Sequence, residues 1–365
     1  MASNRKKIAV AGASGLVGNA IYQEVARRDD FDSIALARRP PADLLGGAFA
    51  SVDVSDRQAC FDFAAANTGL THFAYAALYE QQTLVSGWQS TDQLSVNVQM
   101  LKNILDALAA HCKNLRHITV IHGAKAYGTH VRSIKNPARE GRSESRDIPV
   151  FYWEQEDHLR QVCDEIGASW TILRPVNIFG KASGANNAVP AVGVYAAVMR
   201  ELGHTRLDYT GGAPRIAQAI DADIIGRAVA WAGEADSAKN EIFNIANGDV
   251  YTWDNIWPTV TATLGMEPGD HVPQSLAEFM ADKGPVWDRV REKYRLASPS
   301  MEEFVRTSFQ VCDWFFRHGY TKPEVAILST VKLHRAGFTE EIDTEDMFVK
   351  HFRWMQDQRF LPVYE

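Results

Sequence analysis

A glycine-rich segment near the N-terminus carries the clearest chemistry in this sequence. Gly12, Gly15 and Gly18 follow a short apolar run and precede a helical pattern. Glycines in such a turn let the backbone approach a pyrophosphate, and the following helix offers free N–H groups and the positive end of its dipole. This context predicts a dinucleotide-binding turn, with a tight ligand-free turn as the alternative. The expected contacts are Gly12, Ser14, Gly15, Leu16, Val17 and Gly18.

Two arginines stand at the end of the second apolar run, where a carboxylate would bind the ribose 2′-hydroxyl of NAD. Arg38 and Arg39 could instead hold a 2′-phosphate through bidentate, charge-assisted contacts. The pair therefore favours NADP(H) over NAD(H), unless both are solvated surface residues. After the third run, Asp53 and Val54 are expected to contact the adenine.

The usual catalytic pair of short-chain dehydrogenases is incomplete in this chain. Such enzymes place a tyrosine hydroxyl beside the hydride path and a lysine four residues later, which holds the phenolate form. Here Tyr152 is followed at that spacing by Glu156. Gly123 stands four residues before a Tyr-Gly pair, where extended members usually carry Ser or Thr, and Lys125 appears within the same segment.

Several segments, in order along the chain, match one enzyme family. They are Val17-Gly18-Asn19 at the end of the glycine motif, Ala37-Arg38-Arg39-Pro40, Gly123-Ala124-Lys125-Ala126-Tyr127, Phe151-Tyr152 with Glu156-Asp157, Arg174-Pro175-Val176-Asn177-Ile178-Phe179-Gly180, Asp221-Ala222-Asp223, and residues 239–250. With these segments the sequence resembles the progesterone 5β-reductase/iridoid synthase-like enone reductases, an atypical branch of the short-chain dehydrogenase/reductase superfamily. The likeness extends over essentially the whole chain.

The resemblance implies that Tyr152 and Lys125 are the functional pair. Hydride from NADPH would add to the β-carbon of an α,β-unsaturated carbonyl, while Tyr152 stabilises the enolate and Lys125 lowers the pKa of Tyr152 or orients it. A core tyrosine and a solvated loop lysine are the alternatives. Phe348 and Trp153 are the expected pocket residues, although the family often has tyrosine at position 153. Further cofactor contacts are expected from Ala76, Ala77, His122, Gly123, Lys125, Tyr152, Pro175, Asn177 and Ile178.

The elements that must position these residues can be predicted from the apolar patterns. Strands are expected at 8–11, 33–37, 49–52, 72–76, 116–121, 170–173 and 241–246, and helices at 17–28, 58–66, 96–111, 152–166, near 190–201 and at 219–232. Residues 128–150 are expected to form a loop at the mouth of a site or an ordinary solvated loop. From residue 253 onward the patterns are mostly helical and rich in aromatic residues.

This alternation predicts an α/β fold, a Rossmann-type doubly wound parallel sheet with a smaller, mostly helical C-terminal substrate lid. We expect residues 1–180 with 214–250 to form the NADP-binding Rossmann domain. Residues 181–213 with 251–365 would form the substrate-binding lid.

Composition limits the other functions. The 365 residues carry a net charge of −7, so a nucleic-acid partner is not expected. No stretch approaches the ~20 apolar residues of a membrane span, and no secretory signal is evident, so we expect a cytoplasmic protein. The cysteines lack metal-type spacing and fit buried thiols in a reducing compartment; they are Cys60, Cys112, Cys163 and Cys312.

The sequence as a whole predicts an enzyme, an NADPH-dependent reductase of activated C=C bonds that acts on small apolar enones. One alternative is a sugar-nucleotide epimerase or dehydratase, or a ketone reductase, against which the missing Tyr-x-x-x-Lys motif and Gly123 argue. A second alternative is a non-enzymatic NADP(H) redox sensor, against which the presence of Tyr152 argues. The sequence leaves open whether the chain forms a homodimer.

Overall fold

The computed structural model describes residues 5–81, 90–182 and 187–364. The chain divides into two compact units, each assembled from separated segments. The first comprises Met1–Val176, Ala222–Ile245 and Leu328–Glu340, and the second comprises Asn177–Asp221, Ala246–Ile327 and Glu341–Glu365. These bounds differ from the expected ones. Residues 177–180, 214–221 and 246–250 belong to the second unit, and residues 328–340 return to the first. The assignment of the units as an NADP-binding domain and a substrate lid stays a prediction.

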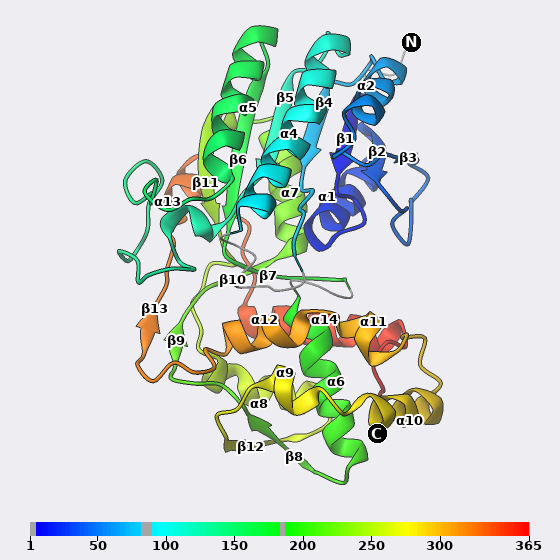
Figure 1. The fold of residues 1–365 in the computed structure, drawn as a ribbon, viewed down its shortest axis with the longest axis vertical. Coiled ribbons are helices and arrows are strands. Elements are labelled where there is room, and N and C mark those ends of the chain that lie inside the picture. The colour runs from blue at the N-terminus through cyan, green and yellow to red at the C-terminus, as the bar shows by residue number, and fades with distance from the viewer. Residues whose placement is uncertain (1–4, 82–89, 183–186, 365) are drawn as a thin grey trace. The chain divides into compact units, whose positions relative to one another are not determined.

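The first unit contains a seven-stranded parallel sheet (Figure 1). Its strands are β1 (Lys6–Ala11), β2 (Phe31–Ala37), β3 (Ala48–Ser51), β4 (His72–Tyr75), β5 (His117–Ile121), β6 (Ser169–Pro175) and β11 (Glu241–Ile245). They lie in the order β11-β6-β5-β4-β1-β2-β3, which confirms the predicted doubly wound Rossmann fold. The order reverses between β1 and β4, and ligands of such sheets bind outside the carboxyl ends of the strands at this reversal.

Helices cover both faces of this sheet. The helices α2 (Arg57–Ala66), α4 (Thr91–His111) and α5 (Tyr152–Ile166) bury their apolar side chains in one core with the sheet. The right-handed crossover from β1 to β2 places α1 (Leu16–Ala26) on the opposite face, and α7 (Ala222–Ala232) packs beside it. There the two helices pack on each other so closely that a Cβ on Gly226 would lie 2.7 Å from the Ala20 carbonyl oxygen.

Most predicted elements occur near the predicted residues, because their apolar periodicity matches the core that they fill. The prediction of a helix over 219–232 is wrong in its first turn. Residues Ala219–Asp221 form strand β10, and α7 begins only at Ala222. β10 pairs with β7 (Asn177–Phe179), a partner that local sequence does not reveal. Residues 128–150 lack regular helix and strand, as predicted, after the short 3₁₀ helix η1 (Ala124–Tyr127).

The second unit is mostly helical, with short two-stranded sheets. Its strands also include β8 (Arg206–Tyr209), which pairs with β12 (Glu267–His271), and β9 (Arg215–Ile216), which pairs with β13 (Glu324–Val325). Its helices are α6 (Ala188–Glu201), α8 (Trp253–Thr263), α9 (Leu276–Met280), α10 (Gly284–Tyr294), α11 (Met301–Val305), α12 (Ser308–Phe315) and α14 (Thr344–Asp357). The short elements η2 (Asp236–Ala238) and α13 (Val331–Arg335) belong to the first unit.

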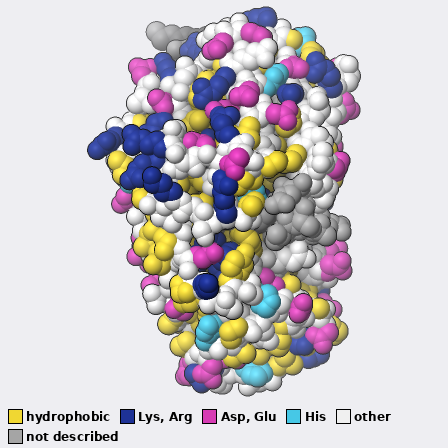
Figure 2. Space-filling model, turned by 60° about the vertical axis from the view of Figure 1, so that its left-hand side comes forward, with side chains coloured by type: hydrophobic (Ala, Val, Ile, Leu, Met, Phe, Trp, Pro, Cys, Tyr) yellow, Lys and Arg dark blue, Asp and Glu magenta, His cyan; other side chains and the backbone are white. Residues whose placement is uncertain are grey.

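The surface carries both signs of charge. Figure 2 shows a face on which Lys and Arg side chains are interspersed with Asp and Glu. All four cysteines are buried and hold free thiols. Among the helices in the described parts of the chain, none is long and apolar enough to cross a membrane.

Candidate active site

The carboxyl ends of the parallel strands gather most of the predicted site residues of the first unit at one edge of the sheet. Neighbouring parallel strands end at the same edge, so residues that follow them lie near one another. The residues at this edge, taken in the order of the strands in the sheet, are Asp53 and Val54 after β3, Arg38 and Arg39 after β2, Gly12 after β1, Ala76 and Ala77 after β4, His122 and Gly123 after β5, and Pro175 at the end of β6.

The glycine turn is closely packed against the end of β4. Gly12 has a φ of +81°, and a Cβ there would lie 2.7 Å from the Ala77 nitrogen and 2.8 Å from the Ala76 carbonyl oxygen. The Gly12 N–H donates to the Leu36 carbonyl at 2.9 Å, which ties the turn to β2. A Cβ on Gly18 would overlap the Gly12 carbonyl, so glycine is required at both positions.

The N-terminus of α1 fits a pyrophosphate. Its N-cap residue is Gly15, no side chain caps the helix, and the first turn has no acidic residue. Ser14 and Gly15 are exposed, while Leu16 and Val17 of the first turn are half-buried. Backbone N–H groups are therefore left for an anion, and the dipole of the helix favours it.

The arginines after β2 lie open to solvent beside an acidic neighbour. Arg38 and Arg39 are both exposed. Asp53 accepts hydrogen bonds from the Ser55 N–H at 3.0 Å and the Ser55 hydroxyl at 2.7 Å. Partial burial raises the pKa of Asp53, but the Ser55 hydrogen bonds and the nearby Arg38 charge hold it below its usual value. The guanidinium groups are thus available to a phosphate near an ionised Asp53.

Tyr152 lies at the point where β5 and β6 end. It is the first residue of α5, it is 7% exposed, and its ring stacks on the His122 ring with centroids 4.3 Å apart. A Cβ on Gly123 would lie 3.1 Å from the Tyr152 hydroxyl oxygen and 3.7 Å from the Pro175 carbonyl oxygen. Gly123, Tyr152 and Pro175 therefore converge, and the missing side chain at 123 leaves room for the hydroxyl. This is a physical reason for glycine where extended members carry Ser or Thr.

The site keeps its imidazole neutral and its phenol protonated. Burial and then the Arg174 charge lower the pKa of His122 well below its usual value. A hydrogen bond with Gln155 raises this pKa by a smaller amount. Burial also raises the pKa of Tyr152; the Glu80 carboxylate raises it further, and Arg174 opposes the shift. Tyr152 is therefore a hydrogen-bond donor at neutral pH.

Lys125 is half-buried in η1 and shares an acidic neighbour with Tyr152. Burial lowers the pKa of Lys125 to about 8, and the Glu80 carboxylate acts against this shift. Burial, and then the Lys125 charge, lower the pKa of His130 to about 4. Sequence reasoning missed Glu80, although its place five residues after the end of β4 could have marked it.

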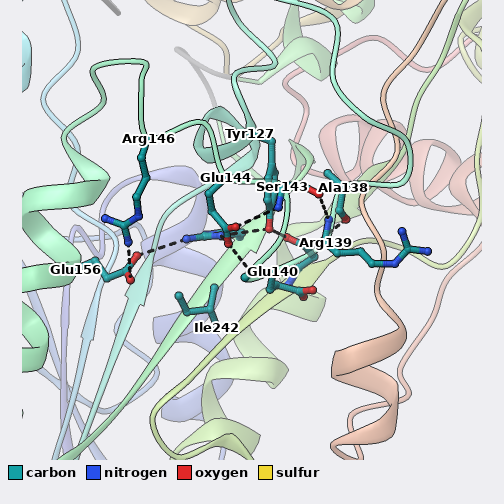
Figure 3. Close-up of polar contacts among 12 residues, drawn as sticks. Tyr127, Ala138, Arg139, Glu140, Ser143, Glu144, Arg146, Glu156 and Ile242 are labelled. Carbon is teal, nitrogen blue, oxygen red and sulfur yellow. Dashed lines mark hydrogen bonds and ion pairs between the residues drawn. The ribbon is translucent and has the colours of Figure 1, made fainter.

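The residue that replaces the usual catalytic lysine belongs to a buried ion-pair network. Glu156 is 3% exposed and pairs with Arg174 at 3.4 Å, Arg146 at 3.1 Å and Arg160 at 2.9 Å. Arg174 is fully buried and also pairs with Glu144 at 2.7 Å. Figure 3 shows Arg146 reaching Glu156 from the loop after η1. Glu156 therefore stabilises a buried cation, and a lysine in its place would meet that cation.

The same network binds Tyr127, the tyrosine of the Tyr-Gly pair. Arg174 donates to the Tyr127 hydroxyl at 3.2 Å, and that hydroxyl donates to the Asn244 side-chain oxygen at 2.6 Å. The Asn244 backbone N–H donates to Glu140 at 2.6 Å, so β11 is tied to the loop. Through these contacts Tyr127 stabilises the fold around Arg174. The sequence did not predict this network.

Trp153 contacts the end of the loop over residues 128–150. Its indole N–H donates to the Ile148 carbonyl at 3.1 Å, and Arg146 lies 4.7 Å from the ring centroid.

Other predicted site residues belong to the second unit. Asn177 and Ile178 begin it in β7. Phe348 is buried among aromatic rings, 4.8 Å from Phe179 and 5.0 Å from Trp253 between centroids. The pocket roles of Trp153 and Phe348 stay predictions.

Comparisons with known proteins identify the family. Residues 68–362 match the model of the PRISE-like Rossmann-fold domain. A relative from Nepeta racemosa, (S)-8-oxocitronellyl enol synthase ISY1, is 30% identical over 326 residues, 84% of this chain and 80% of its own length. The (S)-8-oxocitronellyl enol synthase of Antirrhinum majus is 26% identical over 97% of this chain and 92% of its own length.

Solved structures share the fold at lower identity. A UDP-glucose 4-epimerase is similar with a TM-score of 0.70 and 14% identity, over 99% of this chain and all of its own. The GDP-mannoheptose C4 reductase of Campylobacter jejuni, with NADP bound, has a TM-score of 0.66 and 15% identity, over 97% of this chain and 99% of its own. The family model and the enol synthase relatives confirm the resemblance predicted from the sequence, and the solved structures support the fold. The chain belongs to the PRISE-like Rossmann-fold domain family, among enzymes of the short-chain dehydrogenase/reductase class.

Proposed function

We propose that the chain is an NADPH-dependent reductase that adds hydride to the β-carbon of α,β-unsaturated carbonyl compounds. The observation that carries the proposal is the protonated Tyr152 hydroxyl beside Gly123 and Pro175, with Glu156 in place of the catalytic lysine. Alcohol oxidation needs a base, which a tyrosine with a raised pKa supplies poorly. Enone reduction needs a donor for a developing enolate, and the relatives are named enol synthases.

The cofactor would be held by the glycine turn and the arginines after β2. NADPH, when bound, supplies the hydride. The open N-terminus of α1 would bind its pyrophosphate, and Arg38 and Arg39 would bind its 2′-phosphate. A reductase of the same fold binds NADP. Asp53, which is ionised near Arg38 and hydrogen-bonded by Ser55, would lie at the adenine.

Tyr152 would donate its hydroxyl hydrogen bond to the carbonyl oxygen of the substrate. As the β-carbon accepts hydride, negative charge moves to that oxygen, so the hydrogen bond becomes stronger in the transition state. The neutral His122 ring, stacked on Tyr152, would fix the plane of the phenol without adding a competing charge.

Lys125 would offset the charge of Glu80 near the same hydroxyl. Glu80 raises the pKa of both side chains, so an unopposed Glu80 would disfavour negative charge on the substrate oxygen. A protonated Lys125 compensates for that carboxylate. Lys125 thus assists the enolate through the local field.

The test is turnover of a panel of small enones and enals by the purified protein, followed by the loss of NADPH absorbance. Replacing Tyr152 with Phe should lower kcat by on the order of 10²-fold, because the hydrogen bond to the enolate is lost. NADPH affinity should change little. Tyr195→Phe is a matched control, since the Tyr195 hydroxyl donates to the Asp208 carbonyl in the second unit.

Three results would contradict the proposal. If the protein binds NADPH but reduces no enone or enal, the proposed reaction is wrong. If Tyr152→Phe keeps full activity, the Tyr152 hydroxyl does not stabilise the enolate. Tightly bound NAD⁺ with epimerisation of a nucleotide sugar would favour the epimerase alternative.

A further inference from the structure

The second unit contains two neighbouring arginines with a single carboxylate between them. Arg317 is 4% exposed and pairs with Glu324 at 2.5 Å. Arg215 stands opposite Glu324 in the register of β9 and β13. The Nε atoms of Arg215 and Arg317 are both buried, and neither finds a hydrogen-bond partner among the described residues.

The backbone holds the two arginines close together. The Gly212 N–H donates to the Phe316 carbonyl at 2.9 Å, and the Ala213 N–H donates to the Tyr320 carbonyl at 2.8 Å. A Cβ on Gly212 would lie 2.7 Å from the Tyr320 carbonyl oxygen, so this approach depends on glycine. The turn that carries Arg317 is thereby fixed against the segment that leads to Arg215.

A buried tyrosine hydroxyl completes the group. Ala217 and Tyr251 exchange two backbone hydrogen bonds of 2.9 Å in an antiparallel bridge, and Ala217 lies two residues after Arg215 on the strand-like segment. Tyr251 is 6% exposed, and its hydroxyl makes no hydrogen bond of normal geometry among the described residues. Burial raises the pKa of Tyr251, while the Asn177 side chain and the Arg215 charge oppose that shift. The hydroxyl is therefore protonated and can donate.

The charges of this group are unbalanced. Burial lowers the pKa of Arg215, and the Arg317 charge lowers it further, while Glu324 acts in the opposite direction. Glu324 is the carboxylate that acts on Arg215 and pairs with Arg317, whereas Asp249 acts on Tyr251 and accepts hydrogen bonds from Thr344. The two guanidinium groups therefore keep one positive charge in excess, in a partly desolvated place. A buried charge is costly unless an opposite charge and hydrogen bonds accompany it.

The geometry of the donors favours a planar anion. The Arg317 guanidinium lies 3.2 Å from the centroid of the Tyr320 ring, a stacking contact that fixes its plane. Guanidinium groups bind carboxylates through parallel N–H donors, and a monocarboxylate supplies the single negative charge that this group lacks. A phosphate would bring a larger charge than the excess requires.

We propose that Arg215, Arg317 and Tyr251 form a binding site for the carboxylate of a small organic acid. The site goes beyond the proposed function, because enone reduction requires no acidic group on the ligand. It also stands independently of that function, since its residues belong to the second unit alone and its ligand can be tested by binding without turnover.

Calorimetric titration of the full chain tests this proposal at constant ionic strength. The probes are octanoate, octanamide of the same length without the charge, and inorganic phosphate. We expect octanoate to bind roughly tenfold or more tightly than octanamide, and more tightly than phosphate. Equal binding of octanoate and octanamide, no binding of octanoate, or a preference for phosphate would overturn the proposal.

Variants locate the site. Arg215→Met should weaken octanoate binding by roughly tenfold or more, and Tyr251→Phe by a smaller factor. Arg206→Met is the matched control, because Arg206 lies in the same unit and pairs with the exposed Asp270 at 3.3 Å. Wild-type affinity of Arg215→Met would overturn the assignment. Should Arg215→Met not fold, Arg215→Lys keeps the charge and loses the paired donors, so it should still bind octanoate more weakly than the wild type.

Discussion

At the scale of single residues, an absent side chain gives the Tyr152 hydroxyl its place. Gly123 has an extended backbone that any residue can adopt, so its conformation does not require glycine. The constraint is the distance of 3.1 Å between a Cβ at this position and the Tyr152 hydroxyl oxygen. Gly123, which has no side chain of its own, thus leaves the space in which the Tyr152 hydroxyl lies.

Gly123→Ala should therefore displace the hydroxyl and lower kcat about tenfold or more, because small misplacements of a catalytic group are costly. NADPH affinity and thermal stability should change much less than the rate. Gly69→Ala is the matched control, since nothing lies within 4 Å of a Cβ there. Steady-state kinetics give kcat for both variants. Full activity of Gly123→Ala would show that the space beside Gly123 is not needed to place the Tyr152 hydroxyl.

The lowered pKa of Lys125 should make the rate depend on pH. The pKa of about 8 means that Lys125 loses its proton above this pH in the folded free enzyme, so kcat/KM should fall there. Lys125→Arg should move the fall to higher pH, because arginine keeps its charge. A profile of kcat/KM that stays flat well above pH 8 would contradict the role of the Lys125 charge.

The same shift predicts how stability depends on pH. The folded-state pKa of Lys125 lies below its ordinary value of 10.5, so the unfolded chain binds more protons between these limits. The contribution of Lys125 to the free energy of unfolding should therefore rise as pH increases through this interval. Comparison of the wild type with Lys125→Met by denaturant unfolding isolates that contribution.

At the scale of elements, α5 presents two glutamates with opposite environments. Glu156 faces the buried Arg174, whereas the Glu154 side chain is 69% exposed and lies 3.6 Å from Lys102. The helix thereby delivers Tyr152 to the site and, one turn later, delivers the anion that neutralises a cation on β6.

Glu156→Lys restores the lysine spacing of ordinary short-chain dehydrogenases, but it should not restore their chemistry. It should lower the free energy of unfolding by about 3–5 kcal/mol or more, because it breaks a buried ion pair. Glu154→Lys should change stability by about 1 kcal/mol or less. Chemical denaturation measures the free energy of unfolding of both variants. Equal stability of the two would contradict the stabilisation of the fold by the Glu156–Arg174 ion pair.

The long elements could be predicted because their sequence repeats match their burial. Helix α4 and the strands that flank it have clear periodicity, and the strand ends then indicated where Gly12, Arg38 and Gly123 would meet. The strands β9, β10 and β13 are only two or three residues long, too short for a pattern. The pairing of Arg174 with Glu144 and Glu156 depends on distant segments that meet only in the folded chain.

At the scale of the whole molecule, the chain leaves and re-enters its first unit. Segment Leu328–Glu340 returns to it from the C-terminal part of the sequence. Leu328 is 2% exposed and packs with Tyr127 and Ala138, and the Ser329 N–H donates to the Ala138 carbonyl at 2.8 Å. The loop after η1 is thus supported by residues far away in sequence.

Leu328→Ala should consequently lower the free energy of unfolding by about 2–5 kcal/mol, the usual cost of such a cavity. It should also loosen the segment that carries Lys125, so the rate should fall at temperatures where the fold persists. Leu202→Ala is the control, since Leu202 is 44% exposed. Unfolding of both variants followed by circular dichroism gives the answer, and a stability of Leu328→Ala equal to that of the control would contradict the account.

Enone reduction and ketone reduction differ in the carbon that receives the hydride. The most direct measurement uses NADPH deuterated at C4 of the nicotinamide, a small enone accepted by the enzyme, and analysis of the product by nuclear magnetic resonance. The account predicts deuterium on the β-carbon of a saturated carbonyl product. Deuterium on the carbonyl carbon of an allylic alcohol would contradict it, because that label marks a ketone reductase.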